Sequence, residues 1–177
     1  MNPPSPPGEG RGEGDLDRIV RSAVLRAPLS RAWAAVSDAG RFGRWFGVEL
    51  DRGFEEGARI TGRIVPTAVD AEVARLQEPH RGKPFVFVVE RIEPMRRITF
   101  RWHPFAIDPA QDYSAEPMTR IVFELQEVEG GTRLTITESG FDAIPAQRRE
   151  EAYRANEGGW EHQLDLVGKY LAAPGQA

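Results

Sequence analysis

APLSRAW, residues 27–33, is the stretch that decides the fold, because it marks a β-strand that turns directly into a short helix. Residues 18–27 alternate roughly between polar and apolar side chains. Pro28 ends this strand, because a proline cannot continue the hydrogen-bond ladder. Ser30 is then expected to cap a helix over residues 31–37. The fold therefore starts with a strand and a short helix that carries a tryptophan.

A second short helix follows at once and has a strongly apolar face. Asp38 is expected to cap it, and Gly47 is expected to end it. The large side chains of this helix recur at positions i, i+3 and i+4, which share one face. They are Phe42, Trp45 and Phe46. This helix therefore predicts an aromatic lid at one end of whatever the following strands enclose.

The middle of the chain consists of β-type runs separated by turn residues. In the run 118–128, Ile121 and Phe123 alternate with Arg120 and Glu124, which indicates an antiparallel sheet with one packed face and one wet face. Residues 66–83 fit either a long irregular connection or a turn and a half of helix, and both remain open. The expected strands are residues 48–52, 58–65, 83–92, 95–102, 118–128 and 132–139.

One long helix closes the chain, from Pro145 to Ala172, with Asp142 as a possible cap. It contains GGW, residues 158–160, in which each glycine costs the helix about 1 kcal/mol. Close packing on the sheet or space left for a ligand would explain the glycines equally well. The apolar stripe of this helix is Tyr153, Trp160, Leu164, Val167 and Leu171.

This order of elements predicts an α+β fold. An antiparallel sheet of six or seven strands grips the long C-terminal helix, and two short helices follow the first strand. The 177 residues, 40% hydrophobic and 28% charged, are enough for one globular domain, expected over residues 17–172. Residues 1–16 are rich in Pro, Gly, Glu and Arg and are expected to be a disordered tail without a secretory signal, and residues 173–177 a short C-terminal tail. A cytoplasmic protein is expected.

Several classes of function are disfavoured by composition. The chain has no cysteine, which excludes disulfides, thiolate nucleophiles and iron–sulfur clusters. His80, His103 and His162 have no metal-ligand spacing, so neither a metal nor a cofactor is expected. A net charge of −4 with scattered basic residues disfavours nucleic acid, and the absence of an apolar run of about 20 residues disfavours a membrane span. The oligomeric state is left open.

The chain resembles the helix-grip proteins of the START-like, pollen-allergen-like (SRPBCC) superfamily, and within it the family named after the activator of the Hsp90 ATPase. The resemblance covers roughly residues 17–172 and rests on the order and spacing of short motifs. It implies hydrophobic ligand binding or chaperone regulation and supplies no shared catalytic triad. The matching motifs are Ala27-Pro28 with Ala32-Trp33, Arg44-Trp45-Phe46, Arg101-Trp102, GGTRLT at 130–135, ESGF at 138–141 and EGGW at 157–160.

A cavity between sheet and helix is the expected binding site, although the same residues would also fill a solid core. Trp45 and Phe46 are expected near its mouth. Glu138 ends a strand on the inward side and is expected to need a partner, for which Arg101 or Arg120 is suggested. The residues assigned to the cavity are Trp45, Phe46, Phe87, Phe100, Trp102, Phe123, Trp160 and Leu164.

Three functions are compatible with these residues. The first is a non-catalytic protein that binds a small hydrophobic or aromatic molecule in the cavity. The second is a regulator of a chaperone or another protein partner, which would act through its surface. The third is a cyclase- or hydrolase-type enzyme, which the absence of a recognisable nucleophile–base pair disfavours.

Overall fold

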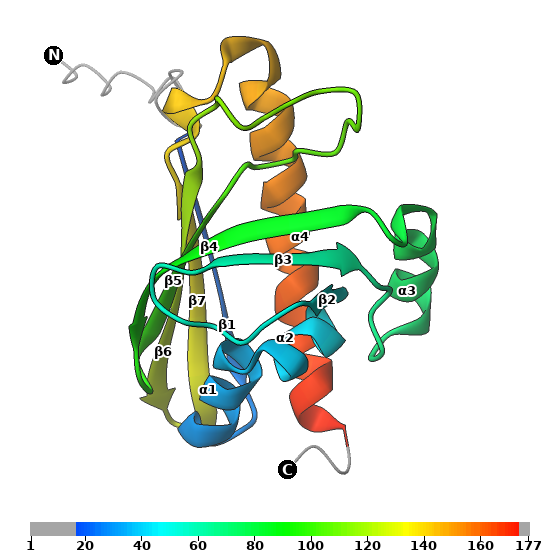
Figure 1. Cartoon of the computed structure of the whole chain (residues 1–177). Coiled ribbons are helices and arrows are strands. Elements are labelled where there is room, and N and C mark those ends of the chain that lie inside the picture. The colour runs from blue at the N-terminus through cyan, green and yellow to red at the C-terminus, as the bar shows by residue number, and fades with distance from the viewer. Residues whose placement is uncertain (1–16, 174–177) are drawn as a thin grey trace, which may run out of the picture.

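The computed structural model describes residues 17–173, and the tails predicted at 1–16 and within 174–177 lie outside the described residues. Seven antiparallel strands form one sheet in the order β1-β7-β6-β5-β4-β3-β2. The strand bounds are β1 Arg18–Leu25, β2 Val48–Leu50, β3 Arg59–Ile64, β4 Pro84–Glu93, β5 Arg97–Trp102, β6 Thr119–Val128 and β7 Gly131–Ser139. This confirms the predicted α+β helix-grip architecture (Figure 1).

The sheet curves around α4, which spans Ala146–Ala172 and lies along its concave side (Figure 1). Over residues 119–126 of β6 the burial alternates, so that Ile121 and Phe123 face the core while Arg120 and Glu124 face outward. The register carries this alternation across the sheet, since Phe123 pairs with Ile98 of β5 and with Ile136 of β7. One packed face and one wet face follow, as the sequence predicted.

Two short helices close one end of the sheet (Figure 1): α1, Leu29–Ser37, and α2, Ala39–Phe46. Asp38 caps α2 as predicted, because its carboxylate accepts a hydrogen bond from the backbone N–H of Arg41 at 2.8 Å. The prediction that Ser30 caps α1 is wrong. The helix begins at Leu29, immediately after Pro28, whose fixed φ suits a helix start, and no side chain caps it.

Of the two structures that the sequence left open for residues 66–83, the helical one is confirmed. A short helix α3, Ala71–Gln77, continues into a 3-10 turn at Glu78–His80. Asp70 caps α3 by accepting hydrogen bonds from two backbone N–H groups, and it also pairs with Lys169 of α4. The long connection between β3 and β4 is therefore attached to the C-terminal helix.

The long helix has the predicted extent and the predicted apolar stripe, all of whose members are buried. Its start differs from the prediction: Asp142 lies in a 3-10 turn, Phe141–Ala143, and no side-chain hydrogen bond caps α4 at Pro145. Close packing does not explain the glycine pair, because no atom lies within 4 Å of a Cβ built at Gly158 or Gly159. The two glycines instead leave open space beside this part of the helix.

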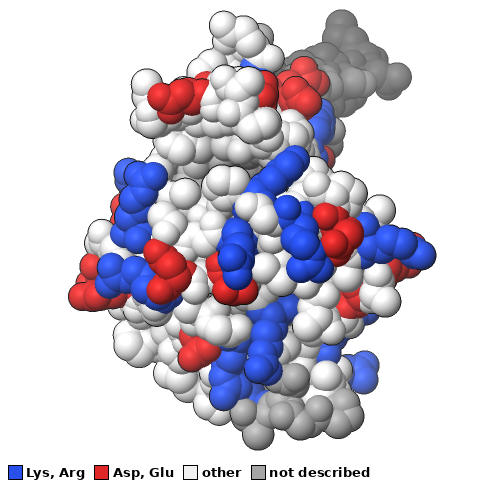
Figure 2. Space-filling model, turned by 45° about the vertical axis from the view of Figure 1, so that its right-hand side comes forward, with Lys and Arg blue, Asp and Glu red and all other residues white. Residues whose placement is uncertain are grey.

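No helix within the described part of the chain is both long enough and apolar enough to cross a membrane. On the face shown in Figure 2, basic and acidic side chains lie beside one another in a band across the middle of the molecule. Such mixing gives no extended field of one sign on this face.

Candidate functional site: an aromatic cavity beside a buried carboxylate

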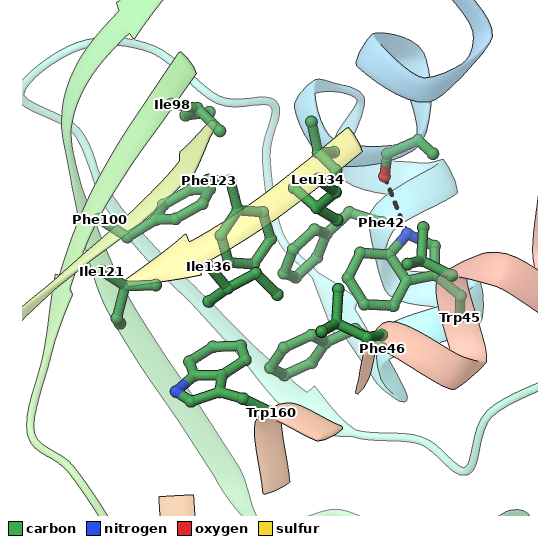
Figure 3. Close-up of a cluster of buried hydrophobic side chains, with 14 of the residues drawn as sticks. Phe42, Trp45, Phe46, Ile98, Phe100, Ile121, Phe123, Leu134, Ile136 and Trp160 are labelled. Atoms are coloured by element: carbon green, nitrogen blue, oxygen red, sulfur yellow. Dashed lines mark hydrogen bonds between the residues drawn. The ribbon is translucent and has the colours of Figure 1, made fainter. Parts of the chain in front are cut away.

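A small cavity lies between the sheet, α2 and α4, and every residue around it is aromatic or aliphatic. The volume in which the centre of a water molecule could lie is about 10 Å³, so the cavity holds at most one water. Figure 3 shows the rings of Phe42 and Phe46 facing Phe123 and Trp160 in this region. The lining residues are Phe42, Phe46, Phe85, Phe87, Phe100, Trp102, Ile121, Phe123 and Trp160.

Ring-to-ring contacts hold the cavity walls in place. Phe42 stacks on Phe46 with a centroid distance of 4.7 Å, and the indoles of Trp102 and Trp160 stack at 5.5 Å. Most other pairs in this cluster meet edge to face, the arrangement that the aromatic quadrupole favours. Phe85 and Trp102 are only half-buried, so the cavity approaches the surface beside these two rings.

The structure brings together six of the eight residues that the sequence assigned to the cavity: Phe46, Phe87, Phe100, Trp102, Phe123 and Trp160. Trp45 and Leu164 do not border it. Trp45 is fully buried instead of lying at a mouth, and its indole N–H donates to the carbonyl oxygen of Ala35 at 2.9 Å. Leu164 is buried elsewhere in the core.

Sequence reasoning missed Phe42, Phe85 and Ile121 as lining residues. A signal for Phe85 and Ile121 was present, because each lies two residues from an assigned residue, Phe87 or Phe123, and therefore on the same face of its strand. The sequence places Phe42 on the apolar face of α2 and gives no sign that its ring borders the cavity.

Behind two of the cavity walls lies Glu138 of β7, whose side chain is fully buried. The indole N–H groups of Trp102 and Trp160 each donate to its carboxylate at 2.7 Å. The hydroxyl of Thr119 donates at 2.6 Å, and the amide of Asn156 donates to both carboxylate oxygens at 3.0 Å. One carboxylate thus joins β5, β6, β7 and α4 and orients both indoles.

The predicted ionic partners of Glu138 are wrong. Arg101 and Arg120 point to the opposite face of the sheet, where both pair with Glu90. Strand alternation explains this, because Arg101 and Arg120 are the direct neighbours of Trp102 and Thr119, which face inward. The actual partners are neutral donors, and the sequence analysis missed Thr119 and Asn156.

Burial raises the pKa of Glu138 above the usual value of a glutamate, because desolvation penalises the charged form; the hydrogen bonds from Thr119 and the other donors partly offset this. No Lys, Arg or His side chain is paired with Glu138 among residues 17–173. The site therefore holds a buried acid that neutral groups solvate and that no cation compensates.

The segment between β5 and β6 is fastened to the start of α4 by Arg148. Its guanidinium donates to Glu116 at 2.5 and 2.8 Å and to the carbonyl oxygen of Pro104 at 2.6 Å, and it lies over the ring of Tyr113. In the same segment burial lowers the pKa of His103, whose Nδ1 atom is buried without a partner. His162, by contrast, is exposed on α4, as the sequence predicted.

A metal site is not assembled by the described residues, since no three His, Cys, Asp or Glu side chains among them come together. The groups around Glu138 are N–H and O–H donors directed at one carboxylate, whereas a metal ion requires ligands that donate lone pairs to it.

The family model for activator of Hsp90 ATPase homolog 1-like proteins matches residues 26–172. The chain belongs to this family. The match includes α2, the strands that line the cavity, Glu138 and all of α4, and the membership places the chain in the SRPBCC superfamily, as its motifs indicated. No curated protein matches the sequence.

Solved structures share the fold at low sequence identity. A protein from Arthrobacter aurescens is similar with a TM-score of 0.67 and 16% identity, over 93% of this chain and 91% of that one. A protein from Bordetella parapertussis has a TM-score of 0.59 and 25% identity over 97% and 84% of the two chains. DynU16, from the dynemicin biosynthetic locus, has a TM-score of 0.61 and 22% identity over 88% of this chain, which spans about half of DynU16 (47%).

Proposed function

We propose that this protein binds a small hydrophobic or aromatic molecule between the sheet and α4. The observation that carries the proposal is the chemistry of the cavity wall, which consists of seven phenylalanine and tryptophan rings from the sheet and α2, one isoleucine, and Trp160 of α4. Apolar walls of this kind suit a guest whose buried surface is itself apolar, because they offer no partner to a polar group.

The wall carries no group suited to chemistry. Its polar atoms are the two indole N–H groups, and both are bound to Glu138, which does not itself border the cavity. A nucleophile or a general base must reach the reacting atom within hydrogen-bond distance. Binding without catalysis is therefore the function that we favour over a cyclase or hydrolase activity.

A guest requires the cavity to enlarge, because drug-sized molecules occupy pockets of about 300 Å³ or more. The wall beside the open side of α4 is where expansion costs least. Phe85 of the wall is half-buried, and on α4 a Cβ built at Gly158 or Gly159 has no atom within 4 Å. Phe46 of α2, 8% exposed, stacks on Phe42 of the same helix and meets Phe85 and Trp102 of the sheet edge to face. We propose that Phe46 and Phe85 move to admit the guest.

Binding is tested with tert-butylbenzene, a small apolar aromatic probe. Trp102 and Trp160 line the cavity, so binding is expected to change the tryptophan fluorescence. It is also expected to raise the unfolding free energy by RT ln(1 + [L]/Kd), about 2.7 kcal/mol at a hundredfold excess over Kd. No change in either quantity up to the solubility limit of the probe would count against a binding cavity.

A matched pair of variants locates the site. Phe46→Leu shortens a side chain on the cavity wall, whereas Phe141→Leu shortens a fully buried side chain of the same core that does not border the cavity. Both variants should lose some stability. Only Phe46→Leu should tighten binding, because it enlarges the cavity. Equal effects of the two variants on the affinity would place the probe elsewhere.

A regulator of a protein partner is the second candidate, and the near-complete filling of the cavity favours it. The apolar surface for such a partner is limited. Five large apolar side chains are exposed among the described residues, and only two of them share an element, Val20 and Val24 on the edge strand β1, which are 46% and 48% exposed; the others are Leu76, Met95 and Ile107. Two valines fall well short of the several hundred Å² typical of a docking patch. Replacing both valines with threonine should leave the binding of tert-butylbenzene unchanged. Loss of a protein partner in that variant would then be an effect of the surface and not of the cavity.

A further inference from the structure

The buried carboxylate and the cavity have so far been described separately, but two side chains belong to both. Trp102 and Trp160 present their N–H edges to Glu138 and line the cavity with their rings. Any molecule in the cavity therefore lies one indole away from a fully buried acid. Because apolar rings surround this region, the field of that acid reaches the guest with little screening.

The aromatic walls act in the same direction. The face of an aromatic ring carries negative potential, and indole is the strongest of the natural side chains in this respect. Two stacked indoles and six phenylalanines surround the space. The indole N–H groups, which are the positive edges of those rings, are turned away from the cavity toward Glu138.

No positive charge offsets this arrangement among the groups around Glu138. The neighbours that face it from β5, β6 and α4 are Trp102, Thr119, Asn156 and Trp160, and none of them carries a charge. The cavity is thus apolar in composition and negative in potential.

We propose that the molecule held in this cavity carries a weakly hydrated organic cation, such as a quaternary or tertiary ammonium group, seated against Trp102 and Trp160 in front of the Glu138 carboxylate. This inference rests on the proposed binding function and adds the charge of the ligand to it. A quaternary ammonium fits because aromatic faces attract it and because it brings no N–H donors that an apolar wall would leave unpaired.

Proton binding at Glu138 couples to such a ligand. A cation in the cavity favours the ionised carboxylate, so cation affinity rises with pH as the proton leaves, whereas the affinity for a neutral guest does not. Charged groups on the same elements are engaged elsewhere: Arg101 and Arg120 with Glu90, and Glu157 with Arg21. Tyr153 of α4 donates to the carbonyl oxygen of Arg18. His103 is next to Trp102 in the sequence, and burial lowers its pKa, so its contribution has to be tested separately.

The test compares phenyltrimethylammonium with tert-butylbenzene, which has the same shape with carbon in place of the charged nitrogen. Tryptophan fluorescence titrations of the wild-type protein between about pH 5 and pH 9 give both affinities, since buried glutamates titrate within that range. At the high end of the range the cation is expected to bind about tenfold more tightly than its neutral counterpart, and the difference is expected to narrow as the pH falls.

Two variants assign the effect. In Glu138→Gln the preference for the cation should fall to within about twofold to threefold, because the negative charge is gone while the indoles remain. His103→Gln should keep both the preference and its pH dependence. These results do not depend on the Glu138 variant alone, because the wild-type pH profile reports the same coupling if that variant does not fold.

The outcomes are distinguishable. Equal affinities at high pH, or tighter binding of tert-butylbenzene, would overturn the cation while leaving the binding function in place. A preference that persists in folded Glu138→Gln, or a pH dependence that disappears in His103→Gln, would overturn the role of Glu138. Binding of neither probe would mean that the proposed function itself fails.

Discussion

Glu138 and Glu90 lie on opposite faces of one sheet and satisfy their charges in opposite ways. On the outer face, Arg120 donates to Glu90 at 2.9 and 3.0 Å and Arg101 approaches to 3.2 Å, with all three side chains partly in water. On the inner face, Glu138 is fully buried and receives only neutral donors. Two residues of the same type thus differ in solvent and in partner.

The two environments are built from adjacent positions on the same strands. Arg101 and Trp102 follow one another in β5, and Thr119 and Arg120 do so in β6. Alternation sends one member of each pair to each face. The pKa values of the two carboxyl groups therefore shift in opposite directions. Burial raises the pKa of Glu138. For Glu90 burial also acts to raise the pKa, but the hydrogen bond and charges of Arg120 and Arg101 outweigh it and lower the pKa.

The largest expected difference between the two faces is in stability. Glu138→Ala leaves four hydrogen-bond donors without their acceptor and is expected to destabilise the protein by about 3–5 kcal/mol. Glu90→Ala, the matched change on the outer face, should cost less than about 1 kcal/mol, because exposed ion pairs contribute little. Urea unfolding of both variants at neutral pH measures the two costs, and similar values would contradict the contrast.

The indole donors should account for a part of the inner-face stability. Trp160→Phe removes one charge-assisted hydrogen bond to Glu138 and keeps an aromatic ring, with an expected cost of about 1.5–3 kcal/mol. Trp45→Phe is the matched control, since it removes a neutral bond to Ala35 at a cost of about 1 kcal/mol. The double variant of Glu138→Gln and Trp160→Phe should lose less than the sum of the single variants.

Stability should depend on pH with opposite signs on the two faces. Folded protein holds the Glu138 proton more tightly than unfolded protein does, so above about pH 4.3 ionisation of Glu138 lowers stability as the pH rises. The stability advantage of the wild type over Glu138→Gln should therefore shrink with rising pH. The advantage of the wild type over Glu90→Gln should instead be lost as the pH falls below about 4.3. Thermal or urea unfolding of these three proteins across pH gives both signs.

The smallest expected effect is the response to salt. The Glu90 pairs are partly exposed, so raising the salt from about 0.1 M to 1 M should reduce their contribution by a few tenths of a kcal/mol. The contribution of Glu138 should be unaffected, because its partners are neutral and water is excluded. A strong salt dependence of the cost of Glu138→Gln would reveal a charged partner that the structure does not contain.

Most of the fold was predictable from periodicity. The alternation in β6 and the stripe on α4 are direct consequences of burying one face of each element, so the sheet, the grip helix and the cap at Asp38 followed from the sequence. The caps at Ser30 and Asp142 did not follow, because Pro28 and Pro145 start their helices without a side-chain acceptor.

The candidate site was less predictable because it depends on register and on packing between elements. Thr119 reaches Glu138 through the pairing of β6 with β7, and Asn156 reaches it one helical turn before Trp160. Neither relation is visible without knowing which strands are neighbours. Trp45 and Leu164 do not border the cavity, although both face inward, because a residue on an inward face fills either the core or the edge of a void and only side-chain packing decides which.

The glycine pair in the middle of α4 has a consequence for local opening of the helix. Toward its N-terminus α4 is fastened by Arg148, and toward its C-terminus by Lys169 and by the backbone carbonyl of Leu171, which accepts from Arg31. Between these attachments, Gly158 and Gly159 contribute no side-chain contacts and weaken the helix by about 1 kcal/mol each. The amide protons around them should exchange with solvent faster than those of the neighbouring interior turns that carry no glycine. In the turn that carries Trp160 against the cavity, the backbone of α4 is thus weakened, and the hydrogen bonds of Asn156 and Trp160 to Glu138 hold this turn to the sheet.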